Sequence, residues 1–186
     1  MLGIEAFNCE SLQEIYVINE MARRYGIKAS ISVRINPDID AHTHKYVTTG
    51  LYENKFGISQ HEFDKLIEII QKSENVDFFG LHFHIGSQIT RVSEVFALEC
   101  KRVNDIVKYF ERQGLTVRNI NLGGGLGVDY DDPDENPIAD FSTWFRTIKE
   151  NIDRRKDQTV HVEPGRSLVA QCGSLVSRVL FVKSGE

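Results

Sequence analysis

Short strand-like runs alternate with longer helix-like patterns along this chain, and that order constrains its fold more than any other feature. The strand-like runs cover residues 4–7, 29–35, 78–85, 117–122 and 160–162. A strand–helix–strand repeat builds parallel strands joined by right-handed crossovers. Two α/β architectures satisfy this order: an open doubly wound sheet and a (β/α)8 barrel.

Residues suited to chemistry follow several different strands, at Asn36, His84, Gly123 and Glu163. A barrel gathers all its strand ends on one face, where the active site is built, whereas an open sheet concentrates such residues at one switch point. The spread over four strands favours the barrel. We therefore predict an α/β chain that forms a partial (β/α)8 barrel of the TIM type.

The helical patterns between the strands carry apolar stripes over residues 15–25, 63–70, 96–110 and 141–152. Ser11 and Glu14 form a capping-box pair in front of the first stripe, and Ser59 and Glu62 repeat that pair in front of the second. Gly114 is the expected stop of the third helix.

Composition excludes several classes of protein. The 41% apolar and 26% charged residues are typical of a globular chain, and the net charge of -5 argues against a nucleic-acid partner. No apolar run approaches the roughly 20 residues of a membrane span, and no secretory signal is visible. The cysteines are three in number and far apart, which favours a reduced, cytoplasmic setting without a metal site: Cys9, Cys100 and Cys172.

Chain length sets a limit on the barrel. A whole (β/α)8 barrel takes about 250 residues and eight strands, whereas this chain has 186 residues and shows five strand-like runs. We therefore expect a fragment, with residues 1–166 forming the second half of the barrel. Residues 167–186 lack a helical stripe and are predicted to form a strand that leads into a β-domain beyond the chain.

The glycine-rich segment NLGGGLG, at 121–127, directly follows a predicted strand. Without Cβ atoms, the backbone N–H groups of Gly123, Gly124 and Gly125 can close on an anion such as a phosphate. The alternative is a plain flexible turn, which is equally common for three glycines.

The segment EPGR stands at the end of the last predicted strand. Glu163 and Arg166 can pair with each other in a surface salt bridge, which stabilises little. They can instead serve two ends of one ligand, with Glu163 facing a cationic ring nitrogen and Arg166 binding a phosphate or carboxylate.

The segment HFHIGSQ, at 82–88, places His82 and His84 on one face of a strand. A metal pair lacks a third ligand at suitable spacing, and a buried, hydrogen-bonded histidine is the commoner arrangement. At the strand end, however, the ring of His84 can stack on a flat ligand while Ser87 donates to its phosphate. All three strand ends thus suit a flat, cationic, phosphorylated molecule, and pyridoxal 5′-phosphate has these properties.

These three motifs, in this order, resemble the diaminopimelate decarboxylases, which are fold-type III pyridoxal-phosphate enzymes with an alanine-racemase-like barrel. The segments GIEAFNCES at 3–11, SVRINP at 32–37 and KFGI at 55–58 resemble the same family. The resemblance covers essentially the whole chain. Ornithine and arginine decarboxylases share EPGR and the glycines, but HIGSQ with NLGGGLG is nearer the diaminopimelate branch.

The resemblance implies a role for each matched residue. It makes His84 a catalytic residue that stacks on the cofactor ring, and it pairs Glu163 with the pyridine nitrogen. Arg166 would also reach the substrate carboxylate, while Arg34 would support the site and Lys55 would lie near a dimer interface. The cofactor-binding set is His84, Ser87, Gly123, Gly124, Gly125, Glu163, Pro164, Gly165 and Arg166.

The activity implied by the resemblance is decarboxylation of meso-2,6-diaminopimelate to L-lysine, in a homodimer. Racemases of this fold carry an arginine at the ring nitrogen, whereas Glu163 favours the protonated, electron-poor ring that decarboxylation needs. The family's cofactor-bound lysine stands in a motif resembling YAxKAN, and none of the ten lysines here does. We therefore expect the chain alone to be inactive and to bind the cofactor weakly.

Three alternatives remain open from the residues alone. The chain can be a pyridoxal-phosphate-binding module without catalysis. It can belong to a decarboxylase of ornithine, arginine or carboxynorspermidine, because substrate choice depends on the missing β-domain. It can also be a half-barrel that binds nothing and assembles with a complementary piece.

Overall fold

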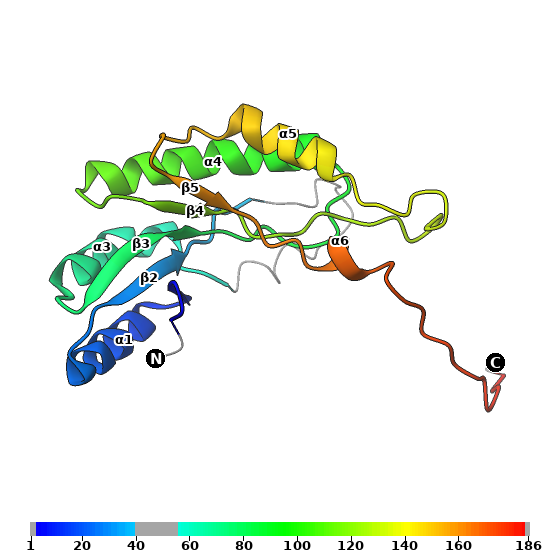
Figure 1. Cartoon of the computed structure of the whole chain (residues 1–186), viewed down its shortest axis with the longest axis horizontal. Coiled ribbons are helices and arrows are strands. Elements are labelled where there is room, and N and C mark those ends of the chain that lie inside the picture. The colour runs from blue at the N-terminus through cyan, green and yellow to red at the C-terminus, as the bar shows by residue number, and fades with distance from the viewer. Residues whose placement is uncertain (1–2, 40–55, 185–186) are drawn as a thin grey trace.

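The computed structural model describes residues 3–39 and 56–184. Its centre is one sheet in which the strands stand side by side in the order β1-β2-β3-β4-β5 and every neighbouring pair is parallel (Figure 1). The strands are β1 (Phe7–Cys9), β2 (Ala29–Arg34), β3 (Val76–His82), β4 (Asn119–Asn121) and β5 (Thr159–His161).

Strand order distinguishes the two architectures that the sequence allows. A doubly wound sheet reverses its strand order at a switch point, whereas these strands follow one another in chain order without reversal. Right-handed crossovers in one unbroken order place every connecting helix on the same face of the sheet. The predicted α/β fold is therefore confirmed, and the sheet is a section of a (β/α)8 barrel.

The helices lie where the apolar stripes predict them. They are α1 (Leu12–Tyr25), α3 (Phe63–Lys72) with a short 3-10 turn η1 (Gln60–Glu62) before it, α4 (Val92–Arg112), α5 (Phe141–Asn151) and the four-residue α6 (Arg166–Val169). Helices α4 and α5 pack against each other along β4 and β5, and α1 packs against β2 and β3 (Figure 1).

The helix ends test the capping predictions. The Ser11 hydroxyl accepts from the N–H of Glu14 at 3.3 Å, and the Glu14 carboxylate accepts from the N–H of Ser11 at 2.9 Å, so the first capping box is confirmed. The second is wrong, because the Ser59 side chain makes no cap hydrogen bond. The N–H of Glu62 donates instead to the backbone oxygen of Ser59 at 3.0 Å, which starts a 3-10 turn.

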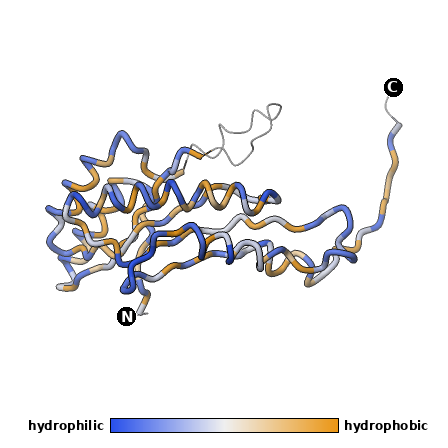
Figure 2. The backbone as a smooth tube through the Cα atoms, turned by 90° about the horizontal axis from the view of Figure 1, so that it is seen from above, coloured by the Kyte–Doolittle hydropathy of each residue, from blue (hydrophilic) through white to orange (hydrophobic). Residues whose placement is uncertain are grey.

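Aromatic side chains fill the layer between the sheet and the helices. The ring of Phe110, on α4, meets Phe63 edge to face at a centroid distance of 5.1 Å and stacks on Phe78 of β3 at 6.3 Å. Trp144, on α5, packs on Phe96 of α4 at 5.4 Å. Figure 2 shows apolar and polar residues alternating along the helices, as expected when one side of each helix faces this layer.

The pairing of β2 with β3 contains a register shift. Ile31 pairs with Phe78 and Ser32 with Gly80, so Phe79 has no partner on β2. An unpaired residue of this kind is a β-bulge, which bends the strand and increases its twist. Phe78, before the bulge, faces the helices, whereas Gly80 and His82, after the bulge, face the other side of the sheet.

The C-terminal segment departs from its predicted form. The sequence predicts a strand over residues 167–186, but α6 covers the first of them, and the described residues from Gly173 onward carry no strand. Their apolar side chains are open to solvent, with Leu175 98% and Phe181 92% exposed, and the segment stands away from the body (Figure 2). A strand exists only through hydrogen bonds to a neighbour, and the described part of the chain offers this segment none.

No helix within residues 3–39 and 56–184 is long and apolar enough to cross a membrane. Two of the three cysteine thiols, Cys9 and Cys100, are buried and free, and burial raises the pKa of each to about 12. Cys172 is free and exposed.

Glu99, on α4, is fully buried, and its two carboxyl oxygens find no hydrogen-bond partner among the described residues. Desolvation raises the pKa of this carboxyl well above its ordinary value of 4.5. The unfolded chain releases this proton above about pH 4.5 while the folded chain keeps it. Folding therefore becomes less favourable as the pH rises through that range.

We predict that Glu99→Gln removes this pH dependence. Relative to the variant, the free energy of unfolding of the parent chain should fall by up to about 1.4 kcal/mol per pH unit above pH 4.5. Urea denaturation from pH 4 to pH 8 measures the difference, and Glu150→Gln, at an exposed position of α5, is the control. A constant difference across this range would contradict the burial of an uncompensated carboxyl.

Candidate functional site

The ends of β3, β4 and β5 are aligned in rows across the sheet. His82 pairs with Asn121, and Asn121 pairs with His161. The ladder continues past the strands, because the N–H of Phe83 donates to Asn121 O at 2.7 Å and the N–H of Glu163 donates to Gly123 O at 2.6 Å. With the side-chain period of two, His84, Gly123 and Glu163 form the next row on the same face.

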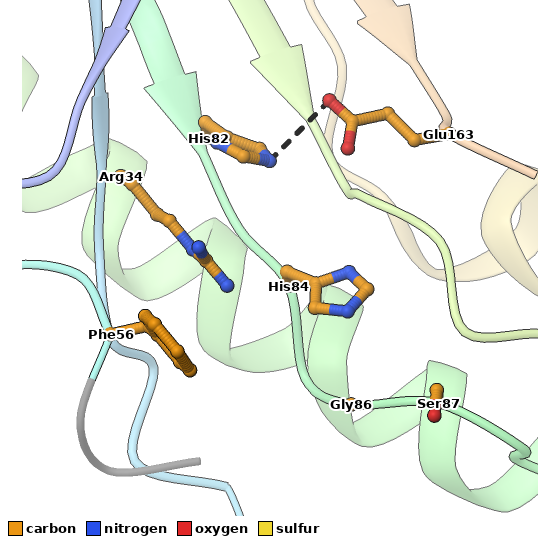
Figure 3. Close-up of a pocket in the computed structure, with 7 residues that line it drawn as sticks. All are labelled: Arg34, Phe56, His82, His84, Gly86, Ser87 and Glu163. Atoms are coloured by element: carbon orange, nitrogen blue, oxygen red, sulfur yellow. Dashed lines mark ion pairs between the residues drawn. The ribbon is translucent and has the colours of Figure 1, made fainter. Parts of the chain in front are cut away.

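Gly123 occupies the middle of that row. Its φ of +67° is left-handed, and a Cβ there would clash with the backbone of Phe83 and the ring of His84. Glycine is therefore required for the close approach of the two strand ends. Because the middle position has no side chain, His84 and Glu163 face the same space from its two sides (Figure 3).

The Glu163 carboxylate is held through one of its two oxygens. Oε1 accepts from Asn121 Nδ2 at 2.8 Å and lies 3.5 Å from His82 Nε2 (Figure 3). Oε2 has no hydrogen-bond partner within the described residues, and the Glu163 side chain is 48% exposed. One oxygen thus fixes the orientation of the carboxylate and leaves the other for a ligand.

The His84 imidazole is neutral in this setting. Its Nδ1 accepts from the N–H of Gly124 at 3.3 Å, which places the ring proton on Nε2. Burial lowers the pKa of His84, and the nearby positive charge of Arg34 lowers it further. A neutral, flat ring at the strand end can stack on a cationic ring without charge repulsion.

His82 is 7% exposed, and neither of its ring nitrogens has a hydrogen-bond partner among the described residues. Burial lowers its pKa, although the negative charge of Glu163 opposes the shift. A buried, unsatisfied imidazole costs free energy. Its Nε2 lies 3.5 Å from Glu163 Oε1, the oxygen that Asn121 holds.

Arg34, at the end of β2, bounds the site on the side opposite Glu163. Its guanidinium donates to the Glu10 carboxylate and lies 5.1 Å from the centroid of the Phe56 ring. The same carboxylate accepts from the N–H of Gly57 at 3.1 Å. The charge of Arg34 is therefore fixed in place, as expected for a residue that supports the site.

These side chains surround a pocket of about 430 Å³, drawn in Figure 3. Of the residues that the sequence assigns to the site, His84, Ser87 and Glu163 line it. The full lining is Arg34, Phe56, His82, His84, Gly86, Ser87 and Glu163. The lining does not include six other residues assigned to the cofactor, namely Gly123, Gly124, Gly125, Pro164, Gly165 and Arg166. Lys55 lies outside the described residues.

The glycine triplet closes the site mainly by allowing backbone contact. A Cβ on Gly124 would clash with the carbonyl oxygen of Glu163, and one on Gly125 would clash with that of Gly86. The N–H of Gly123 donates to Asn121 Oδ1 at 2.9 Å, and that of Gly124 donates to His84. Of these three glycine amides, that of Gly125 alone has no acceptor within the described residues, so it is the one of the three that is free to bind an anion.

Arg166 does not pair with Glu163. Its Nη1 donates to Gln88 Oε1 at 3.2 Å, and its guanidinium lies 5.9 Å from the centroid of the Tyr130 ring. Among the described residues, Glu163 and Arg166 do not form the surface salt bridge that their spacing allows. The carboxylate and the guanidinium therefore point to different places, as the ligand-binding alternative requires.

Sequence reasoning missed two residues that organise this site. Asn121 joins Glu163 to the glycine turn, and Gln88 joins three loops. The period of two gives a signal for Asn121, since it stands two residues before Gly123 on the same face. No local signal identifies Gln88, because its partners lie 40 and 78 residues away.

No cluster of three or more histidine, cysteine or acidic side chains suited to a metal ion occurs within 3–39 and 56–184. His82 and His84 instead face Glu163 and the amide of Gly124, respectively. The site combines one carboxylate, one fixed guanidinium, one buried imidazole and one half-buried imidazole, a set suited to an organic ligand of mixed charge.

Comparison with known proteins gives a consistent result. Residues 1–170 match the family of the pyridoxal-dependent decarboxylases, pyridoxal binding domain. The diaminopimelate decarboxylase of Bacteroides thetaiotaomicron is 49% identical over 183 residues, which cover 98% of this chain and 47% of that relative. The diaminopimelate decarboxylase of Neisseria meningitidis serogroup A is 39% identical, with 99% of this chain and 44% of the relative covered.

Solved structures agree with this result. Diaminopimelate decarboxylase from Helicobacter pylori, complexed with L-lysine, superposes with a TM-score of 0.76 at 38% identity over 91% of this chain and 42% of that one. The arginine decarboxylase of Paramecium bursaria Chlorella virus, at 24% identity and a TM-score of 0.64, shares the fold. The chain spans less than half the length of the curated relatives it matches.

We predict that Gly124→Ala destabilises the chain by about 1–3 kcal/mol, the usual cost of overpacking, because its methyl group meets the backbone of Glu163. Gly173→Ala is the matched control, since nothing lies within 4 Å of a Cβ there and neither glycine has a left-handed φ. Chemical denaturation measures both. Equal stability of the two variants would show that the strand ends are not in close contact.

We predict that the imidazoles of His82 and His84 titrate below pH 6.5, the ordinary value for histidine. Because the unfolded chain takes up these protons first, the stabilisation that depends on the neutral rings is lost as the pH falls below 6.5. Nitrogen-15 NMR of the two rings measures the midpoints and should show His84 protonated on Nε2. A midpoint at or above 6.5 would contradict their burial.

Proposed function

The chain belongs to the pyridoxal-dependent decarboxylases through their pyridoxal-binding domain, and we propose that it serves the decarboxylation of meso-2,6-diaminopimelate to L-lysine. The substrate class rests on the relatives, which are named diaminopimelate decarboxylases at 36–49% identity. The neighbour with another substrate supports only the fold, because it is 24% identical. A homodimer and the division at residue 166 belong to the same proposal.

The geometry of the site fits pyridoxal 5′-phosphate. The pocket of about 430 Å³ has a flat neutral ring at one wall and a carboxylate with one open oxygen at another. The N–H of Gly125 has no acceptor within the described residues, and a Cβ on Gly125 would meet the carbonyl oxygen of Gly86. These features match a planar ring, a ring nitrogen that carries a proton, and a phosphate.

Glu163 holds a proton at the ring nitrogen in this proposal. Pyridoxal phosphate supplies an electron sink for the electron pair left at Cα when CO2 departs. A carboxylate beside the pyridine nitrogen favours its protonated form. The hydrogen bond from Asn121 keeps Oε1 of Glu163 turned towards His82, so that Oε2 is the oxygen presented to the ring.

His84 and the loop residues orient the ligand. His84 stacks on one face of the ring, and its neutral state avoids repulsion with the protonated pyridine. Ser87 and the N–H groups of Gly125, Gly165 and Arg166 hold the phosphate. Arg166 also binds the substrate carboxylate, which its guanidinium matches through two parallel hydrogen bonds.

One observation carries the proposal: Glu163 and His84 face one space across a residue that has no side chain. The row comes from the ladder hydrogen bonds and from the clash that any Cβ on Gly123 would cause. An open carboxylate oxygen and a stacking ring are the pair that a protonated pyridine requires. A site for a simple anion would need neither.

We predict that replacing the equivalent segment of the Bacteroides thetaiotaomicron relative by this chain yields a protein that releases CO2 from meso-diaminopimelate. Glu163→Gln in this chimera should lower kcat about a hundredfold or more, because the ring nitrogen loses its negative partner. Release of CO2 is measured directly, and Glu150→Gln is the matched control on an exposed surface.

Two outcomes would contradict the proposal. A Glu163→Gln chimera with undiminished kcat would show that the carboxylate does not serve the ring nitrogen. A chimera that folds and binds pyridoxal phosphate but decarboxylates L-ornithine or L-arginine in preference would show that the substrate differs.

A further inference from the structure

Gln88 has a backbone conformation that side chains rarely adopt. Its φ is +59°, in the left-handed region that favours glycine. Glycine, and less often asparagine or aspartate, are the residues that usually adopt this conformation. Conformations of this kind persist where surrounding contacts hold them and are frequent at ligand sites. The side chain of Gln88 makes such contacts.

The Gln88 carboxamide forms a reciprocal pair with the backbone of Val128. Its Nε2 donates to Val128 O at 2.6 Å, and its Oε1 accepts from the N–H of Val128 at 3.3 Å. Val128 directly follows the glycine-rich turn. The pair therefore ties the loop after β3 to the loop after β4.

The same carboxamide oxygen reaches a third loop. Oε1 of Gln88 also accepts from Arg166 Nη1 at 3.2 Å, in the segment after β5. The Arg166 guanidinium is further held against the ring of Tyr130. One neutral side chain thus connects the ends of three neighbouring strands.

These three loops carry the residues assigned to the phosphate. Ser87 precedes Gln88 in the chain, Gly125 is fixed beside it by the bond from Ile89 N–H to Gly125 O at 2.9 Å, and Arg166 is its direct partner. Without the carboxamide, the guanidinium would lose the hydrogen bond that fixes its Nη1. The glycine turn would also lose two of the bonds that hold it to the loop after β3.

We propose that Gln88 is a positioning residue that gives the site its preference for a phosphorylated pyridine over an unphosphorylated one. It acts by holding Arg166 and the glycine turn in the arrangement that receives the phosphate. This inference rests on the proposed function, and it adds a role for a residue that touches neither the ring nor the pocket.

The chain offers a matched control for a purely structural role. Asn104, on α4, makes the same reciprocal pair with backbone groups: its Nδ2 donates to Asn151 O at 2.9 Å, and its Oδ1 accepts from the N–H of Asp153 at 2.9 Å. This pair fastens the end of α5, outside the pocket lining. Truncation of Asn104 removes the same two bonds without touching the strand-end loops.

The test measures non-covalent affinity for pyridoxine 5′-phosphate and for pyridoxine, which lack the aldehyde and so form no bond to a lysine. Isothermal titration of the parent chain should show tighter binding of the phosphorylated probe. Gln88→Ala should weaken that binding about tenfold or more while changing pyridoxine affinity less than twofold. Asn104→Ala should leave both affinities within twofold.

Two further variants separate the carboxamide from the backbone. Gln88→Gly relieves the left-handed φ but should lose the phosphate preference as Gln88→Ala does. Gln88→Glu keeps an oxygen that faces Arg166, but it removes the donor to Val128 O and adds a negative charge beside the phosphate, so it should also lose that preference; this provides a measurement if Gln88→Ala fails to fold. Retention of the preference in Gln88→Gly would overturn the inference, because the carboxamide would then be dispensable.

The outcomes distinguish this inference from the proposed function. If the parent chain shows no preference for the phosphorylated probe, the assignment of the phosphate site fails, and the inference fails with it. If the parent chain shows the preference and Gln88→Ala keeps it, only the role of Gln88 is refuted. Equal losses of affinity in Gln88→Ala and Asn104→Ala would reveal a general loss of stability and would also refute that role.

Discussion

The continuous hydrogen-bond ladder across the ends of β3, β4 and β5 determines the rest of the site. Because the ladder runs past the regular strands, His84, Gly123 and Glu163 stand in one row. The pocket, the orientation of the carboxylate and the neutral state of the imidazole all follow from that alignment. The row depends on backbone bonds, so its geometry is set before any ligand arrives.

Much of the fold was predictable from the sequence, since period and order are local or nearly local signals. The order of the five strands, the helices of the apolar stripes and the Ser11 capping box follow from spacing alone, although β1 (Phe7–Cys9) lies later than the run predicted over residues 4–7. Two predictions failed for the same physical reason. Ser59 and the C-terminal run depend on which backbone group is available as a partner, and spacing does not specify that group.

The candidate site divides in the same way. The motif residues His84, Ser87 and Glu163 line the pocket, because strand ends of a parallel sheet converge. The sequence suggests that the glycine triplet binds an anion through its backbone amides. In the structure, two of the three amides donate to protein side chains, and the absence of Cβ atoms allows neighbouring backbone to come close. Gln88 acts over 40 and 78 residues, a range that no sequence window covers.

The bulge at Phe79 has a consequence for how this sheet tolerates change. In an unbroken strand, Phe78 and His82 would point to the same face; the extra residue lets Phe78 stack on Phe110 while His82 turns to Glu163. Deletion of that single residue would turn the side chains at one end of β3 to the opposite face of the sheet. The phenyl ring of Phe78 would then face the pocket, or the imidazole of His82 would enter the apolar layer between the sheet and the helices. The number of residues in β3 at this bulge is thus as constrained as the identity of any side chain in the site.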